Sequence, residues 1–392
     1  MKKILMMFMV CLLWCNVVFA ETKMPKIAAQ GAVLVDGDSG RVLWGKNEDV
    51  PLTMASTTKI MTAIVILEYG NLDDMVKVSK KAANAAKVRM GLSVDEEVRE
   101  EDLLYAMMLR SYNDAAVALA EHIGGSVEGF CNMMTEKAKE IHAKDTVFNS
   151  PNGLDSNLSF EQHHSTAYDM ALIARYALAN PKFVEIINTS AVDIPMKGGT
   201  GKHYSVTNAN RFLNSYDGAF GVKTGYTNKA GQCFVGAAKR GDKTFITTVL
   251  GSGWGSRGKE QKWEDTKNLM DYGFENYEKR TLVQPGKFVG NTKVIHSPVK
   301  YVPAVLQKGY TALFCDEELQ RIEVKVFQKE KLEAPLQAGE KLGYIEILLD
   351  DAVLDKIELI ATKNANKYTL NEMLHEMSKQ WGELDIFLQK SE

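Results

Sequence analysis

The sequence predicts an α/β fold in which one sheet is assembled from two distant parts of the chain. Residues 32–45, AVLVDGDSGRVLWG, form two strand-like runs around an Asp-Ser-Gly turn and predict a hairpin. Residues 79–190 are mainly helical in periodicity. Strand patterns return in AFGVKTGYT and GQCFVGAAKRGDKTFITTVLG, followed by a helical EDTKNLMDYGFENY. This order predicts a sheet with flanking helices and a helical insert, which we place at residues 21–282.

Two smaller units are expected after this domain. Pro285 and Gly286 interrupt the pattern, and QRIEVKVFQ then alternates apolar and charged residues, as a half-exposed strand does. We therefore expect a small all-β domain at residues 283–364 that serves as a spacer or partner surface. Residues 365–392 predict a C-terminal amphipathic helix, whose apolar stripe is formed by Leu370, Met373, Leu374, Met377, Trp381, Leu384 and Leu388.

Composition and charge limit the possible partners. The 392 residues are 45% hydrophobic and 25% charged, with a net charge of -3, so no electrostatic footprint for nucleic acid is present. Trp381 suits peripheral contact with a membrane interface, whereas five acids and two lysines in residues 370–392 do not favour anionic lipid. Packing of this helix on its own protein or on a second copy is the alternative.

The first 20 residues predict export. Two lysines precede an apolar run, and Val18 and Ala20 are placed as in a signal-peptidase site. An uncleaved membrane anchor is the alternative, and both place the protein in the periplasm or on the outer face of the cytoplasmic membrane. The mature chain keeps three widely spaced cysteines, which we interpret as buried apolar residues, although an exported protein can form a disulfide: Cys131, Cys233 and Cys315.

The stretch ASTTKIMTAIVILE, residues 55–68, is the first with a chemical signal. Its apolar composition after Lys59 predicts a helix buried on most faces, and positions i and i+3 bring Ser56 and Lys59 together. A buried lysine costs free energy unless it has partners. The same spacing recurs at Ser256 and Ser297, but only Ser56 is expected to open a helix.

Two further short motifs, at residues 111–113 and 223–225, carry polar side chains suited to chemistry. Ser111, Tyr112 and Asn113 interrupt two apolar helical runs, whereas a competing Ser-Pro-Asn at residues 150–152 predicts only a turn. Lys223, Thr224 and Gly225 occur once, in a strand-like context, where the glycine allows a ligand to approach the backbone.

Ser-x-x-Lys, Ser-x-Asn and Lys-Thr-Gly, in this order, resemble the penicillin-interacting serine enzymes. With the export signal and the small β domain, the chain is similar to the low-molecular-mass D-alanyl-D-alanine carboxypeptidases among the penicillin-binding proteins. FNSPNGLD, TNANRFL and APLQAGEKLG extend the resemblance over nearly the whole mature chain. It implies a β-lactamase/transpeptidase-like sheet and the removal of a terminal D-alanine from peptidoglycan pentapeptides. β-Lactams would be covalent inhibitors, and neither a metal nor a cofactor is required.

The resemblance also implies roles for single residues. Ser56 would be the nucleophile, and Lys59 its base, kept neutral by burial and by the nearby Lys223 cation. Ser111 would relay a proton to the leaving amine, and Asn113 would hold Lys59 or the substrate amide.

The Lys-Thr-Gly strand would bind the substrate. Lys223 and Thr224 would engage the terminal carboxylate, with Arg257 or Lys262 as an additional cation, a choice that the sequence leaves open. Gly225 allows close approach, and the backbone N–H groups of Ser56 and Tyr226 would form the oxyanion hole.

Three alternatives remain at this stage. A β-lactamase would share these groups but needs a deacylating glutamate, and Glu161 lacks the Glu-x-x-Leu-Asn setting of such enzymes. A catalytically idle wall-binding protein would not need three intact motifs. Endopeptidase activity in the same site is a variant of the main prediction. The implied mechanism does not need His142, His163 or His164, and the pair at 163 and 164 lacks the i, i+4 helical spacing of metal ligands.

Overall fold

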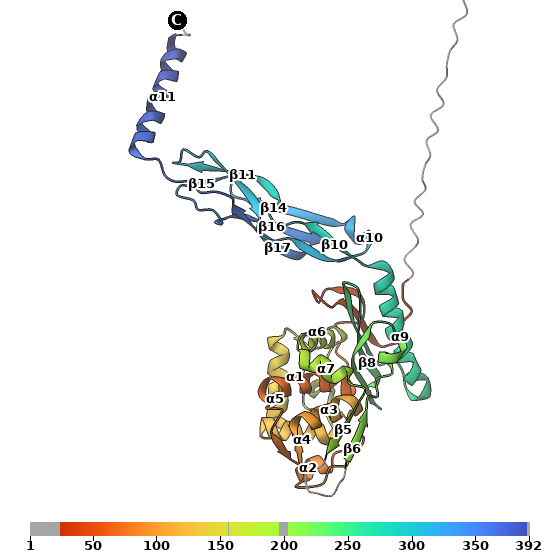
Figure 1. Cartoon of the computed structure of the whole chain (residues 1–392). Coiled ribbons are helices and arrows are strands. Elements are labelled where there is room, and N and C mark those ends of the chain that lie inside the picture. Colours follow the sequence, from red (N-terminus) through yellow and green to blue (C-terminus); the bar gives the residue numbers. More distant parts are fainter. Residues whose placement is uncertain (1–23, 156, 196–202, 390–392) are drawn as a thin grey trace, which may run out of the picture.

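The computed structural model describes residues 24–155, 157–195 and 203–389. The predicted signal peptide lies outside these residues. Figure 1 shows an elongated molecule with an α/β domain at one end, a β domain extending from it, and the C-terminal helix at the far end. The α/β class and the order of the units agree with the prediction.

The sheet of the α/β domain is built from both ends of its segment. Its five strands have the order β2-β1-β9-β8-β7, and β1 pairs antiparallel with both β2 and β9. The hairpin predicted near the start of the domain therefore lies beside strands about 200 residues later in the chain. The strands are β1 (Gly31–Asp36), β2 (Val42–Lys46), β7 (Ala219–Thr227), β8 (Gly231–Arg240) and β9 (Lys243–Leu250).

Side chains that alternate along β1 enter different cores. Val33 and Val35 belong to the core formed with the helical insert, whereas Ala32 and Leu34 belong to the core beneath α9. Both faces of the sheet are thus covered, and Figure 1 shows α9 on the side opposite α1, α3, α4, α5, α6 and α7. The main helices are α1 (Lys59–Tyr69), α3 (Glu100–Arg110), α4 (Asn113–Gly124), α5 (Val127–Glu140), α6 (Ala167–Leu178), α7 (Pro181–Asn188) and α9 (Gly255–Asn276).

Short elements complete this domain. A 3-10 turn, η1 (Ala55–Thr58), precedes α1 directly. The others are α2 (Lys80–Ala83), η2 (Phe160–Gln162), α8 (Phe212–Ser215) and the strand pairs β3 (Met75–Lys77) with β4 (Glu97–Arg99) and β5 (Ala191–Pro195) with β6 (His203–Thr207).

One expectation about helix starts was wrong. Because α9 begins at Gly255, Ser256 also stands in a first helical turn, with Lys259 one turn later. Both residues are exposed, so this Ser-x-x-Lys lies on the surface. The glycines around Ser256 belong to the loop that leads into α9 and do not prevent helix formation.

The β domain contains a six-stranded sheet of order β14-β16-β17-β12-β11-β15 and a two-stranded pair, β10 with β13. Its core is formed by residues such as Val302, Leu342 and Ile357. The strands are β10 (Glu278–Val283), β11 (Phe288–Ile295), β12 (Tyr301–Leu306), β13 (Tyr310–Phe314), β14 (Ile322–Gln328), β15 (Lys331–Glu333), β16 (Lys341–Leu349) and β17 (Ala352–Ala361), with a short helix α10 (Asp316–Leu319).

The strand predicted in QRIEVKVFQ is present as β14, but it is more exposed than expected. Val324 is 48% exposed and Val326 is 50% exposed, whereas their cross-strand neighbours Ile347 and Ile345 are buried. The alternating pattern correctly predicts a strand. The pattern cannot show that β14 is the terminal strand of its sheet, where no further strand covers its valines.

An arginine from the β1–β2 hairpin joins the two domains. Arg41 contacts both carboxylate oxygens of Glu318, at 2.6 and 3.0 Å, and its guanidinium lies 4.9 Å from the centre of the Phe314 ring. Lys279 adds a 2.9 Å contact to Asp38. Paired fork-like contacts of this kind fix geometry as well as adding energy.

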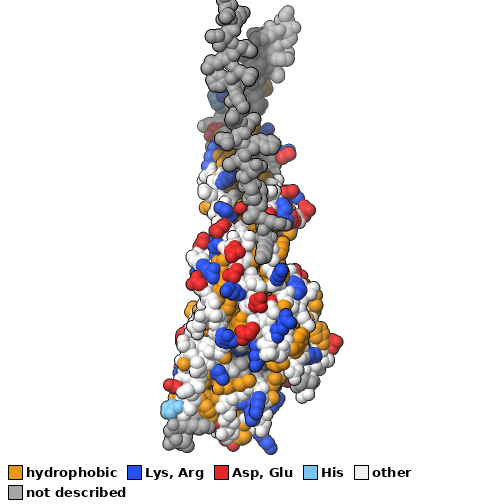
Figure 2. All heavy atoms as spheres, turned by 90° about the vertical axis from the view of Figure 1, so that its right-hand side faces the viewer, with side chains coloured by type: hydrophobic (Ala, Val, Ile, Leu, Met, Phe, Trp, Pro, Cys, Tyr) orange, Lys and Arg blue, Asp and Glu red, His pale blue; other side chains and the backbone are white. Residues whose placement is uncertain are grey.

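The C-terminal helix α11 (Leu370–Gln389) exposes its apolar stripe. The described side chains on this stripe are 47–73% exposed, so they do not pack on the rest of the protein: Leu370, Met373, Leu374, Met377 and Trp381. Among the described residues, no helix is both long and apolar enough to cross a membrane. Figure 2 shows basic and acidic side chains interspersed on the face turned to the viewer.

Candidate active site

Ser56 and Lys59 meet where η1 leads into α1. Lys59 is fully buried, and its Nζ lies 3.1 Å from Ser56 Oγ, 2.9 Å from Asn113 Oδ1 and 2.7 Å from the backbone oxygen of Asn152. Ser56 Oγ donates a 3.2 Å hydrogen bond to the same Asn152 oxygen. The amine is therefore held against the serine hydroxyl by two other oxygens.

The junction between α3 and α4 supplies the second element. Ser111 adopts a left-handed conformation with φ of 63°, which ends α3, and Asn113 begins α4. Asn113 Nδ2 donates a 3.0 Å hydrogen bond to the oxygen of Ala86, so its Oδ1 is turned to Lys59. Ser111 Oγ is shielded from solvent and has no hydrogen-bond partner among the described atoms. An unpartnered buried hydroxyl is unusual in a stable interior.

The Lys-Thr-Gly segment lies on β7, the edge strand beside η1. A Cβ on Gly225 would lie 2.9 Å from the backbone nitrogen of Ser56, closer than real Cβ contacts allow. Gly153, with φ of 82°, approaches the Ala55 oxygen in the same way. These two glycines let β7 and the 152–153 turn approach the backbone of Ala55 and Ser56 closely.

The buried lysines of the site have lowered pKa values. Burial, followed by the Lys223 cation, lowers the pKa of Lys59 well below its ordinary value, and Asp114 opposes this shift. Lys223 is 3% exposed, and burial, followed by Lys262, lowers its pKa to about 7. An amine with a lowered pKa is available as a base near neutral pH.

Of the two candidates for an additional cation beside Lys223, Arg257 and Lys262, only Lys262 belongs to this cluster. Lys262 is buried, its Nζ lies 2.5 Å from Gln232 Oε1, and its charge acts on Lys223. Burial lowers its pKa to about 8. Arg257 is exposed on the first turns of α9. Lys262 is therefore the cation that extends the buried lysine cluster.

Sequence reasoning missed the part played by the turn at residues 150–152. It is a turn, as expected, but the Asn152 oxygen accepts hydrogen bonds from both Ser56 and Lys59. The turn is held by the Ser150 hydroxyl, which donates to Asn152 Oδ1 and accepts from Gly153 N–H. A backbone oxygen leaves no trace in the residue types of a sequence. The only indication of an unusual turn was that Gly153 follows Asn152.

Other candidate residues fall outside the cluster. Glu161 is exposed on η2, and His163 is buried among Thr58 and Asn149 with its pKa lowered to about 4 by burial. The described residues include no group of three or more His, Cys, Asp or Glu side chains that can hold a metal. The three mature cysteines are free and buried, as we expected: Cys131, Cys233 and Cys315.

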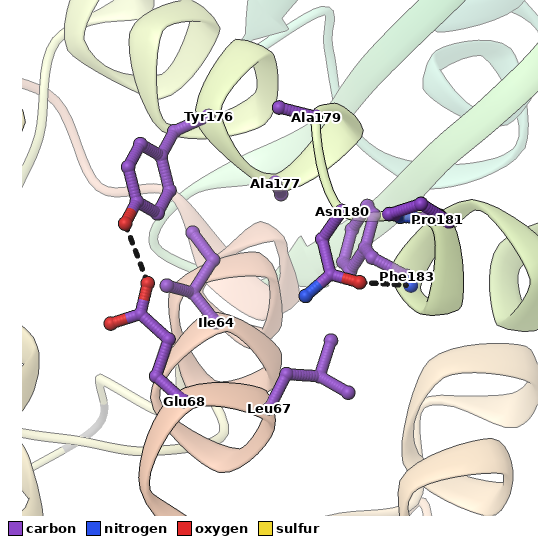
Figure 3. Close-up of a pocket in the computed structure, with 9 residues that line it drawn as sticks. All are labelled: Ile64, Leu67, Glu68, Tyr176, Ala177, Ala179, Asn180, Pro181 and Phe183. Carbon is purple, nitrogen blue, oxygen red and sulfur yellow. Dashed lines mark hydrogen bonds between the residues drawn. The ribbon is translucent and has the colours of Figure 1, made fainter.

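An apolar pocket of about 430 Å³ lies elsewhere, between the C-terminal half of α1 and the α6–α7 region. Figure 3 shows Tyr176 hydrogen-bonded to Glu68 on one side of it and Asn180 capping Phe183 N–H on the other. Ser56, Lys59 and Lys223 do not line this pocket. This pocket is therefore separate from the lysine cluster around Ser56.

The geometry agrees with comparisons to known proteins. A family model for D-alanyl-D-alanine carboxypeptidase, peptidase family S11, matches residues 18–253. The chain belongs to this family. A second model, for the C-terminal domain of penicillin-binding protein 5, matches residues 277–367. The predictions of fold and of a serine carboxypeptidase are thereby confirmed.

Individual relatives cover most of the chain. The D-alanyl-D-alanine carboxypeptidase DacF of Bacillus subtilis is 32% identical over 359 residues, 90% of each chain. The carboxypeptidase of Streptomyces sp. K15 is 35% identical over 65% of this chain and 90% of its own. The crystal structure of penicillin-binding protein 5 from Haemophilus influenzae is 27% identical, with a TM-score of 0.70 over 88% of this chain and 100% of its own.

Proposed function

We propose that this protein removes the terminal D-alanine from peptidoglycan stem pentapeptides through an acyl-enzyme on Ser56. The observation that carries the proposal is the buried Lys59 amine, 3.1 Å from Ser56 Oγ and with a strongly lowered pKa. A serine hydroxyl needs such a base to become a nucleophile at neutral pH.

In the acylation step, Ser56 Oγ transfers its proton to neutral Lys59 and attacks the carbonyl carbon of the penultimate D-alanine. The N–H groups of Ser56 and Tyr226 receive the developing oxyanion, and the closeness of Gly225 to the Ser56 nitrogen supports this pairing. When the C–N bond breaks, the leaving amine takes the proton from Lys59 through Ser111 Oγ. Water then attacks the ester carbonyl as Lys59 takes a proton from it, and when the ester C–O bond breaks Lys59 returns this proton to Ser56 Oγ.

The substrate carboxylate is bound by Lys223 and Thr224, with Lys262 adding positive charge behind Lys223. An anion that binds beside these amines favours their protonated forms and partly offsets the cost of burying them. This arrangement selects substrates that end in a free carboxylate, as expected of a carboxypeptidase.

Exposure of Glu161 argues against a β-lactamase. A deacylating glutamate must hold and activate a water beside the ester carbon, whereas the Glu161 side chain lies in solvent on η2. We therefore expect the penicilloyl ester to persist.

We also propose that the enzyme acts outside the cytoplasm, exported by residues 1–20, and that α11 rests on the membrane surface. Its apolar side chains are exposed, and Trp381 is 73% exposed. A flotation assay with and without residues 368–392 tests the tail. If both forms stay in the soluble fraction, the membrane contact is wrong.

Intact-mass analysis after brief exposure to benzylpenicillin, followed over hours, tests the main proposal. A lasting single adduct on the mature protein that is absent from Ser56→Ala, with D-alanine release from a pentapeptide by the unmodified enzyme only, is expected. Rapid loss of penicillin without a lasting adduct would indicate a β-lactamase. No reaction at all would indicate a binding protein.

A further inference from the structure

The edge of the β domain presents an unpaired strand. β14 is the terminal strand of its sheet and pairs only with β16 among the residues that the structure describes. Residues 323–327 are all exposed. An edge strand of this kind exposes backbone N–H and C=O groups that can pair with another strand.

The apolar face of β14 continues the buried face of the sheet. Val324 lies opposite Ile347, and Val326 lies opposite Ile345, and both isoleucines are at most 2% exposed. The two valines remain about half exposed, at 48% and 50%. The sheet thus ends with apolar surface that one more strand would cover.

On the opposite face of β14, a row of alternating charges that crosses the sheet ends at Lys325. Across the sheet, Lys356 lies opposite Glu346, and Glu346 lies opposite Lys325. Lys356 Nζ and Glu346 Oε1 are 3.3 Å apart. Lys325 is the last charge in this row, and an acidic residue on an added strand would continue the alternation.

We propose that β14 pairs antiparallel with β14 of a second copy, around a two-fold axis at Val324. In this register Glu323 of each copy faces Lys325 of the other, and Ile322 faces Val326. Each copy thereby supplies the acid that follows Lys325 in the row. The two sheets join into one, with valines meeting at the axis on its other face.

Charge selects this register over its neighbours. An axis at residue 323 would place two glutamates opposite each other, and an axis at residue 325 would do the same with two lysines. Like charges directly opposite destabilise a strand pair. Charges on an edge strand usually prevent pairing. Here their signs and their spacing of two residues make the edge complementary to itself.

Sedimentation of the full mature protein over a range of concentrations tests the proposal. The interface is a single strand pair, so we expect a weak, concentration-dependent dimer. Glu323→Lys and Lys325→Glu should each weaken it by about tenfold or more, because both ionic pairs become repulsive. The double variant, with the two charges exchanged, should restore it, and a mixture of the two single variants should form a heterodimer.

A cysteine at the axis tests the register. Directly opposite residues in an antiparallel pair have Cα atoms about 4.5 or 5.5 Å apart, within disulfide range. Val324→Cys should therefore form an intermolecular disulfide on mild oxidation. Lys331→Cys, on the opposite edge strand β15, is the matched control and should not. The native cysteines are buried and should not interfere.

Acylation by benzylpenicillin should be unchanged in all of these variants, which shows that they are folded. The proposal is overturned if the protein sediments as a monomer at every concentration. It is also overturned if a dimer survives both single charge reversals, because another surface, such as the stripe on α11, would then hold it. Failure of this pairing leaves the proposed function intact, since Ser56 chemistry is measured separately.

Discussion

The three lysines clustered near Ser56 and the lysines of the β domain have opposite surroundings. In the α/β domain, Lys59, Lys223 and Lys262 are at most 8% exposed, and none forms an ion pair with a described carboxylate. In the β domain, lysines such as Lys308 and Lys356 are exposed and paired with Asp355 and Glu346. The pKa values of Lys59 and Lys223 are lowered, and that of Lys356 is raised.

The two groups of lysines suit different roles, the exposed ones surface ion pairs and the buried ones acid–base chemistry. An exposed ion pair adds little stability and keeps its lysine protonated. A buried, unpaired lysine costs stability, and the lowered pKa that results makes it useful as a base.

The largest effect is expected at Lys59. Lys59→Arg keeps a long basic side chain but removes the base, because a guanidinium stays protonated where the Lys59 amine is neutral. Acylation by benzylpenicillin should fall by about 10²–10⁴-fold, the usual value of a general base. Lys137→Arg is the matched control, since Lys137 is also buried but paired with Glu68 and Glu140. A Lys59→Arg enzyme that acylates normally would remove Lys59 from the mechanism.

Gly225→Ala tests the close approach of β7 to Ser56. The added Cβ would stand 2.9 Å from the Ser56 nitrogen, so either the strand or η1 must shift. A displacement of about 1 Å can cost roughly 10²-fold in rate. Acylation rate and thermal midpoint should be measured together, and a slow enzyme with a nearly normal midpoint is expected.

The pH profile should report both lysines. Acylation should fall at acidic pH as Lys59 gains a proton, and carboxylate binding should weaken above about pH 7 as Lys223 loses its charge. Lys223→Arg keeps the charge and should extend activity to higher pH. The second-order acylation rate from pH 5 to 10 measures this. An unchanged alkaline limb in the variant would assign that limb to another group.

Replacing Lys223 by methionine should stabilise the fold while harming function. The pKa of Lys223 is about 7 in the folded protein and near 10.4 when unfolded, so folding releases its proton between these values. The methionine variant should gain roughly 1–4 kcal/mol in the free energy of unfolding below pH 7. This gain should shrink as pH rises toward about 10. Denaturant unfolding at pH 6 and 9 tests the difference.

The smallest effect is expected at Lys356. Lys356→Met removes an exposed ion pair to Glu346 and should leave both acylation and the thermal midpoint within measurement error. A clear loss of midpoint would show that the charged row across this sheet matters more to the fold than exposed pairs usually do.

Much of the site could be predicted from the sequence because its groups are local. Ser56 with Lys59, and Ser111 with Asn113, need only helical spacing or a helix break. The Asn152 oxygen could not be found in this way, since every residue has a carbonyl and only the folded chain brings this one to Lys59.

Burial was harder to predict than secondary structure. The alternation of apolar and charged residues in β14 correctly predicts a strand. Val324 is nevertheless exposed, because β14 has a neighbouring strand on one side only. Likewise, the sequence could not choose between Arg257 and Lys262. Helix α9 extends through both residues and buries only the second.

The Arg41 contacts also have a consequence for the proposed membrane contact of α11. Arg41 lies in the turn between β1 and β2, two strands of the sheet that also contains Lys223, and its contacts with Glu318 and Phe314 brace that sheet against the β domain. In Figure 1 the α/β domain and α11 stand at opposite ends of this braced unit. If α11 rests on a membrane, as we propose, this braced unit would hold Ser56 at a fixed distance from that membrane and would limit hydrolysis to one layer of the wall.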